Sequence, residues 1–243
     1  AAQLTTYAAK ELANKGQTPS ERVIAEIYSK ISENKTPADK KAFYDKLRDD
    51  IDSLPKFGND NKEIDLFARD VAYTYTRPLQ DYKNPRGGIF QAGLYPVSAN
   101  VPLGAQTGAT PDGRLAGTPV ADGVSPSSGK DVNGPTAACN SVARLDHYIA
   151  SNGTLFNMKF HPSALKGKSG LESFVALVRG YFDQKGSHVQ FNVVSRETLL
   201  DAQKNPEKYK SLVVRVAGYS ALFTTLSRSL QDDIINRTEQ GGI

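Results

Sequence analysis

Apolar residues recur at helical spacing through residues 1–82, in three stripes that would each lie on one face of a helix. Thr18-Pro19-Ser20-Glu21 and Thr36-Pro37-Ala38-Asp39 precede the first two stripes, and each places a capping threonine before a first-turn proline and an acidic residue. A break at 54–60 precedes the third stripe, which runs toward Pro78. The pattern predicts three helices with one buried face each. The stripe residues are Val23, Ile24, Ile27, Tyr28 and Ile31, then Phe43, Leu47 and Ile51, then Ile64, Phe67, Ala68, Val71 and Tyr75.

The stretch 84–134 has no helical period, little charge and dense glycine and proline. In a compact domain, an irregular stretch of this length is expected to line a site or an interface. Thr110-Pro111-Asp112-Gly113 has the residues of a tight turn, with proline fixing φ and glycine allowing positive φ. A phosphate-binding loop at 123–130 is excluded, because five residues separate its glycines where that loop has four, and Asp131 stands at the Mg²⁺-binding Ser/Thr position.

Helical and strand patterns alternate from residue 141 onward. In the strand pattern at 188–193, polar residues alternate with valine and phenylalanine, which predicts one polar and one apolar face. An apolar strand at 212–216 ends abruptly at Ala217-Gly218-Tyr219. Strands separated by helices of this length predict an α/β fold with a parallel sheet or barrel. The predicted helices cover 141–151, 171–186, 195–205 and 230–235, and the predicted strands cover 154–160, 189–193 and 212–216.

The composition is that of an ordinary globular protein, with 39% hydrophobic and 23% charged residues. No run approaches the roughly 20 apolar residues of a membrane-spanning helix, and residues 1–5 lack the features of a secretory signal, which favours a cytoplasmic location. The net charge of +4 is spread along the chain and does not indicate nucleic-acid binding. A start in helical sequence without an initiator methionine is typical of an internal point of a longer polypeptide.

The sequence contains no clear motif for a metal site or an activated nucleophile. His147, His161 and His188 lie on different predicted elements with no carboxylate at ligand spacing, so we expect hydrogen-bonded structural residues and no metal site from this chain. The single cysteine, Cys139, excludes a disulfide within the chain. Its small neighbours and the lack of an adjacent base favour a buried structural thiol over a nucleophile.

The segment Arg215-Val216-Ala217-Gly218-Tyr219 resembles the radical-bearing segment of the glycyl radical enzymes. A glycine at a strand end is ordinarily explained by a turn that needs positive φ. Here the likeness extends over roughly residues 54–243, and the segments 199–202 and 205–209 resemble pyruvate formate-lyase. The further segments that carry the resemblance are Thr107–Arg114, Leu199–Ala202, Asn205–Tyr209 and Leu230–Thr238.

The resemblance implies the C-terminal part of a ten-stranded barrel, built from two parallel half-barrels surrounded by helices, with a glycine loop at its centre. It implies that Gly218 stores a radical, delocalised between the flanking amide nitrogen and carbonyl, which a side chain would hinder. No cofactor is then bound, and a radical S-adenosylmethionine activating enzyme installs the radical after translation. Arg237 corresponds to a family arginine near the glycine loop, and its alternative is a surface charge of the last helix.

The sequence departs from the family pattern at the cysteine that attacks the substrate. The family's thiyl cysteine lies in a Gly-Cys-x-Glu loop that this sequence lacks, and Cys139 does not match it. The resemblance therefore implies that the remaining N-terminal part of a larger enzyme supplies the thiol and a general-base glutamate. We expect residues 1–119 to belong to the barrel domain and 120–243 to form the glycine radical domain. The implied partners are the activating enzyme, the missing N-terminal part, a second copy in a homodimer and a small-molecule substrate.

Three segments resemble the dehydratase branch, the cobalamin-independent glycerol and propane-1,2-diol dehydratases: 94–104, 150–157 and 161–165. In that branch the tyrosine matching Tyr95 lines the substrate pocket and the loop around Ala164 borders it. The implied reaction removes water from a small diol to give an aldehyde, under anaerobic conditions. Two alternatives stay open: another glycyl radical lyase, of the choline trimethylamine-lyase or formate acetyltransferase type, and a non-catalytic radical protein that repairs a damaged lyase. Because residues 1–119 resemble barrel sequence, the enzyme is favoured.

Overall fold

The structure is a computed structural model that describes residues 36–110 and 112–243. The helix expected after Thr18 lies outside the described residues. The chain divides into two compact units, one of residues 1–55 with 108–117 and the other of residues 56–107 with 118–243. Among the described residues, no helix combines the length and the apolar character needed to cross a membrane.

In the smaller unit, α3 (Pro37–Ser53) begins where the sequence predicts it. The Thr36 side chain accepts the Asp39 N–H, and the Asp39 carboxylate accepts the Thr36 N–H, which completes a capping box. The predicted turn is also confirmed, since the Gly113 N–H donates to the Thr110 carbonyl at 3.1 Å and Gly113 has a φ of 96°. The side chains of Phe43 and Leu47, on the predicted stripe, lie outside the described part.

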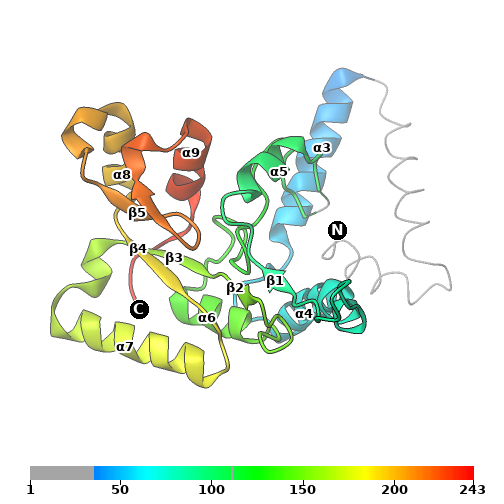
Figure 1. Ribbon diagram of the computed structural model, residues 1–243. Helices are drawn as coiled ribbons and strands as arrows, with labels where there is room; N and C mark the ends of the chain where they lie inside the picture. Colours follow the sequence, from blue (N-terminus) through cyan, green and yellow to red (C-terminus); the bar gives the residue numbers. More distant parts are fainter. Residues whose placement is uncertain (1–35, 111) are drawn as a thin grey trace. The chain divides into compact units, whose positions relative to one another are not determined.

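The larger unit is an α/β structure around a short parallel sheet (Figure 1). The sheet order is β4-β3-β7, with all neighbours parallel, and β1 and β2 form a second parallel pair. The elements are α4 (Lys62–Thr76), η1 (Pro78–Asp81), β1 (Gly93–Leu94), α5 (Asn100–Gln106), α6 (Pro135–Ala143), β2 (Gly153–Thr154), β3 (Asn157–Phe160), η2 (Pro162–Leu165), α7 (Gly167–Asp183), β4 (Gln190–Val193), α8 (Arg196–Lys204), η3 (Pro206–Tyr209), β5 (Val213–Arg215), β6 (Ser220–Leu222), η4 (Phe223–Thr225), α9 (Arg228–Asn236) and β7 (Glu239–Gln240).

The sheet separates two cores. In Figure 1, α6 and α7 lie on one side of β3 and β4, and α8, α9 and the β5–β6 hairpin lie on the other. Met158 and Phe160 face the first side and pack with Leu177 and Tyr181 of α7. On the second side, β5, α8 and α9 enclose a core of their own, whose buried members are Val194, Leu199, Ala202, Val214, Val216, Phe223, Leu230, Ile234 and Ile235.

The polar face of β3 and β4 is buried. The register places Asn157 opposite Gln190 and Lys159 opposite Asn192, and each of these four side chains is at most 9% exposed. The sequence prediction of one polar and one apolar strand face is confirmed, but alternation alone does not say that the polar face is the covered one. Buried polar groups need hydrogen-bond partners. Lys159 illustrates this, because its Nζ donates to the Ile235 carbonyl at 2.8 Å while burial lowers its pKa to about 8.

Two secondary-structure predictions are wrong. The helix expected at 141–151 is displaced to α6, which begins at Pro135 in the first-turn position that proline fits. Its first half consists of small residues that leave no apolar stripe, so the sequence pattern missed it. The stretch 84–134 is irregular as expected except for the two-residue strand β1 and for α5, where Gly104 allows the Thr118 and Pro119 backbone to approach the helix closely.

The buried face predicted for α4 is partly open, and so is the apolar stripe of α7. On α4, Val71 and Tyr75 are 48% and 51% exposed, although Ile64, Phe67 and Ala68 of the same stripe are half-buried. On α7, Leu171 is 57% exposed. No element of the described part of the larger unit covers these positions, so helical spacing identified apolar stripes correctly but not their full burial.

Candidate functional site

Gly218 lies in the turn of the β5–β6 hairpin. The turn is closed by the Val216 N–H, which donates to the Tyr219 carbonyl at 2.9 Å. Gly218 has a φ of 81°, in the region that favours glycine. A Cβ at this position would meet only Leu155 Cδ1, at 3.4 Å, which is ordinary van der Waals contact. The backbone conformation therefore favours glycine here, while the space around it would admit a methyl group.

Gln190, at the start of β4, holds the amide of Gly218. Its side-chain carbonyl Oε1 accepts the Gly218 N–H at 3.2 Å. The same oxygen accepts two N–H groups of the Arg215 guanidinium, from Nε at 3.2 Å and from Nη2 at 2.9 Å. On the other side, Gln190 Nε2 donates to Asn157 Oδ1, and Asn157 Nδ2 donates to the Asp122 carboxylate. A continuous chain of buried polar side chains thus runs from Asp122 to the Gly218 backbone.

Asn192 fixes the strand that leads to Gly218. Its Oδ1 accepts the Arg215 N–H and its Nδ2 donates to the Arg215 carbonyl, both at 2.8 Å. This pair of bonds satisfies both backbone polar groups of Arg215, much as a neighbouring strand would. The last residue of β5 is therefore attached to the sheet three residues before the glycine.

Arg237, directly after α9, holds the hairpin from a second side. Its Nη1 donates to the Val216 carbonyl at 2.8 Å, and its Nη2 lies 3.0 Å from the Asp233 carboxylate and 3.2 Å from that of Asp122. The side chain is 9% exposed, so the alternative of a surface charge is wrong. Burial raises the pKa of the Asp122 carboxyl to about 6, although the Arg237 charge and the Asn157 hydrogen bond oppose the rise.

Asp122 connects the two sets of polar contacts that hold the hairpin. Through Asn157 and Gln190 it connects to the Gly218 amide, and through Arg237 to the Val216 carbonyl. No pattern in the sequence marks Asp122 or Asn157 as site residues. The alternation at 188–193 was the available signal, because it placed Gln190 on a polar strand face.

Tyr95 follows β1 and is 42% exposed, with its hydroxyl accepting a hydrogen bond from Asn152 Nδ2 at 3.0 Å. The carbonyl of the preceding residue, Leu94, accepts the Leu155 N–H at 3.3 Å. The Leu155 side chain in turn lies closest to the position that a Cβ on Gly218 would take. The structure therefore connects Tyr95 to Gly218 through a short series of neighbours.

Ala164 lies elsewhere on the sheet. It belongs to η2, beyond the carboxyl end of β3, whereas Gly218 contacts Gln190 and Leu155 near the amino ends of β4 and β3. The described residues do not bring Ala164 to the glycine, and its role at a substrate pocket stays a prediction.

His147, His188 and the cysteine have the structural roles that the sequence predicts. His147 bonds to Thr154 Oγ1 and to the Val142 carbonyl, each at 2.8 Å, and burial lowers its pKa. His188 accepts the Phe156 N–H at 3.4 Å. Cys139 is 3% exposed, and burial raises the pKa of its thiol to about 12. A thiol this difficult to ionise is a poor nucleophile.

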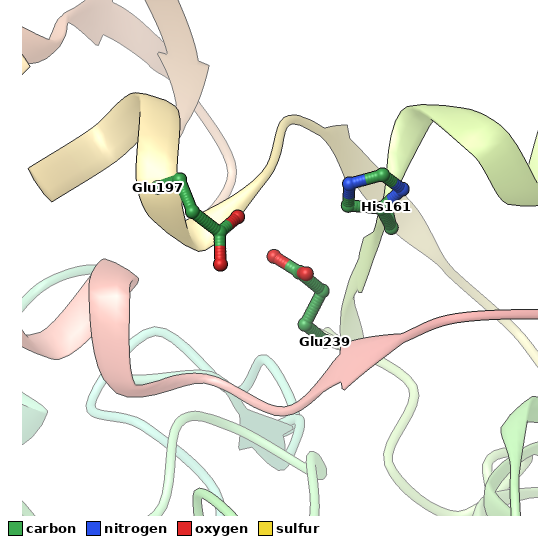
Figure 2. A group of neighbouring side chains, drawn as sticks. All are labelled: His161, Glu197 and Glu239. Atoms are coloured by element: carbon green, nitrogen blue, oxygen red, sulfur yellow. The ribbon is translucent and has the colours of Figure 1, made fainter. Parts of the chain in front are cut away.

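His161 lies beside two carboxylates that sequence spacing did not reveal, those of Glu197 and Glu239 (Figure 2). One ligand atom from each residue lies within 4.8 Å of the others. His161 Nδ1 contacts both polar groups of Ser163, the N–H at 3.2 Å and the hydroxyl at 2.6 Å, so this ring nitrogen caps the turn at η2. Glu239 accepts the Arg196 N–H at 2.6 Å, where the N-terminus of α8 favours a carboxylate. Structural roles account for this group.

Comparison with known proteins places these observations in a family. Two family models match the chain, "Glycine radical" over residues 120–224 and "Pyruvate formate lyase-like" over residues 22–104. A probable dehydratase of Escherichia coli is 50% identical over 196 residues, which is 78% of this chain and 24% of that protein.

Two solved structures are also similar. One, from work on 1,2-propanediol dehydration in Roseburia inulinivorans, has a TM-score of 0.86 and 64% identity over 97% of this chain. The B12-independent glycerol dehydratase of Clostridium butyricum, with glycerol bound, has a TM-score of 0.85 and 54% identity over 99% of this chain. The chain spans 30% of each of these structures. With Gly218 inside the region that matches the glycine radical model, the chain belongs to the glycyl radical enzymes.

Proposed function

We propose that this chain is the C-terminal, radical-storing portion of a glycyl radical dehydratase, with Gly218 as the radical residue. The observation that carries the proposal is the placement of Gly218 at a positive φ in a hairpin turn that buried polar side chains hold from two sides. A radical on its α-carbon would be delocalised over the flanking peptide groups. An activating enzyme that uses S-adenosylmethionine would remove the hydrogen atom and so install the radical.

The remainder of the enzyme would supply the working thiol and its neighbouring glutamate. The only cysteine of this chain, Cys139, is buried with a raised pKa, which makes it unsuitable for this role. Exposed apolar side chains on the strands of the hairpin, such as Val213 and Leu222, fit a surface that the rest of the protein covers. The parallel strands are those of two half-barrels in a ten-stranded barrel, with residues 1–119 in the barrel domain and 120–243 in the glycine radical domain. We further propose a cytoplasmic homodimer.

The reaction we propose is the elimination of water from a small vicinal diol. The thiyl radical removes a hydrogen atom from C1, and loss of the C1 hydroxyl proton gives a ketyl. The C2 hydroxyl takes up that proton and leaves as water, and the product radical recovers a hydrogen atom from the cysteine to give an aldehyde. The glycerol and 1,2-propanediol subjects of the two similar structures support this substrate class.

Turnover by the activated full-length protein tests the substrate class. We expect aldehyde formation from glycerol or propane-1,2-diol, and none from choline or from pyruvate with coenzyme A. Trimethylamine release, formate production, or no turnover of either diol would reject the dehydratase assignment while leaving the family assignment untouched. A protein that is inactive itself but restores an oxygen-cleaved pyruvate formate-lyase would instead be a repair module.

Tyr95→Phe is expected to change turnover without changing the radical. We propose that its exposed hydroxyl contacts the substrate, and loss of one such hydrogen bond changes kcat/KM by about fivefold. The radical yield should match that of the unsubstituted enzyme, because Gly218 contacts Leu155 and not Tyr95. Tyr148→Phe, at a side chain that is 93% exposed, is the matched control and should leave both quantities unchanged. Equal kcat/KM in the two variants would contradict a role for Tyr95.

A further inference from the structure

We propose that Gln190 is a positioning residue for the radical glycine, and that its side-chain carbonyl sets both how readily the Gly218 segment opens and how long a radical there persists. The inference rests on the proposed radical at Gly218. It deepens that function by assigning the control of the stored radical to a side chain on β4, 28 residues away along the chain.

The orientation of the Gln190 amide is fixed by its neighbours. Oε1 faces three N–H groups, one from Gly218 and two from Arg215, while Nε2 faces the Asn157 carbonyl oxygen. Exchanging the amide oxygen and nitrogen would set donors against donors and an acceptor against an acceptor. With 6% of its surface exposed, the side chain also has little access to water. Gln190 therefore presents its carbonyl to the Gly218 amide in one orientation.

The Gly218 N–H has a different role from the other polar groups of the turn. The hydrogen bond that closes the turn uses the Val216 N–H and the Tyr219 carbonyl, which leaves the Gly218 N–H to the side chain of Gln190. The hairpin cannot leave the sheet without breaking this bond. The free energy of the Gln190–Gly218 bond is thus part of the free energy of opening.

The same bond acts on the electronic state of the glycine. A radical on the α-carbon is stabilised when the adjacent nitrogen donates electron density and both peptide planes stay aligned. An acceptor on the N–H strengthens that donation and restrains rotation of the peptide plane. Arg215 contributes by holding the acceptor in place, since its guanidinium contacts Gln190 Oε1 and not the glycine.

The test is Gln190→Met in the full-length protein, which keeps the length of the side chain and removes its hydrogen bonds. Hydrogen–deuterium exchange of the Gly218 amide, resolved by mass spectrometry of the hairpin peptide, reports the open fraction. We expect exchange about fivefold faster than in the unsubstituted protein, since one neutral hydrogen bond contributes about that factor. Radical installation by the activating enzyme should become faster, and the anaerobic half-life of the radical signal should become shorter.

Three companion variants separate positioning from general damage. Gln184→Met, at an exposed glutamine of the α7 C-cap, should leave exchange, activation and radical half-life unchanged. Gln190→Glu keeps an acceptor for Arg215 and the Gly218 N–H but sets its second oxygen against Asn157 Oδ1, so it should restore part of the protection of the Gly218 amide. Arg215→Met leaves Gln190 in place but frees its amide to rotate, so we expect an exchange rate between those of the unsubstituted protein and Gln190→Met. If Gln190→Met does not fold, Arg215→Met provides the test in its place.

The results distinguish this inference from the proposed function. If the unsubstituted protein forms the radical and the Gln190→Met and Arg215→Met variants match it in exchange and half-life, the inference is overturned and the proposed function stands. Slower activation together with a shorter half-life would also overturn it, because general damage lowers both. If the unsubstituted protein forms no radical under full activation, the proposed function fails, and the inference fails with it.

Discussion

Gly218→Ala in the complete, activated protein is expected to abolish the organic radical signal. Alanine also has an α-hydrogen, but its methyl group hinders the planar arrangement of the radical and the approach of the abstracting group. The fold should survive, because the added Cβ would meet only Leu155 Cδ1 at 3.4 Å. The positive φ should lower stability by about 1–2 kcal/mol. Electron paramagnetic resonance after anaerobic activation measures the result directly.

Gly167→Ala is the matched control for backbone strain. Gly167 also has a positive φ, 75°, and has nothing within 4 Å of an added Cβ. We expect a similar loss of stability with a full radical signal. Oxygen should cut the activated protein at Gly218, so that the released C-terminal piece begins at residue 219. A radical signal that survives in Gly218→Ala, or a cut at another position, would contradict the assignment of the radical residue.

Arg237→Met is expected to destabilise the protein strongly. The substitution leaves the Asp122 and Asp233 carboxylates, 8% and 5% exposed, without their cation, and it removes the bond to the Val216 carbonyl. Removing one partner of a buried ion pair costs about 3–5 kcal/mol. The loss should appear as a lower thermal midpoint and as faster hydrogen exchange in the hairpin, because the second attachment of the turn is gone.

Arg228→Met provides the comparison on the same helix. Arg228 pairs with Asp232 at the same i,i+4 spacing as the Asp233–Arg237 pair, but the two side chains are 69% and 47% exposed. An exposed pair contributes about 0–1 kcal/mol. Nearly equal losses of stability in the two variants would show that the burial of Arg237 and its contact with the hairpin add nothing to the stability of the fold.

Local signals in the sequence identified many elements and the glycine itself. Thr36 and Ser195 each begin a helix with a side-chain cap, and the end of the apolar strand at 212–216 marked the turn at Gly218. Such features depend on neighbouring residues, so sequence reasoning reaches them. The small-residue helix α6 offered no such signal and was misplaced.

The contacts around the glycine could not be predicted in the same way. Asp122, Asn157, Gln190 and Arg237 are separated by 30 or more residues from one another, and only the sheet register and the position of α9 bring them together. A polar strand face is equally compatible with solvent and with a buried network. The carboxylates beside His161 could not be predicted for the same reason, since Glu197 and Glu239 reach it only through the fold.

The hydrogen bonds that attach the turn at residues 216–219 to the rest of the fold use its main chain. Gln190 bonds to the Gly218 N–H, Arg237 to the Val216 carbonyl, and Asn192 to both backbone groups of Arg215. None of these bonds depends on the side chain of Tyr219, which is 37% exposed. The turn should therefore tolerate replacement by semisynthesis. A synthetic segment with an isotopically labelled glycine at position 218 and an altered residue 219 should pair with the sheet in the same register. A segment with Gly218→Pro should not adopt that register, because proline lacks the N–H that donates to Gln190 Oε1.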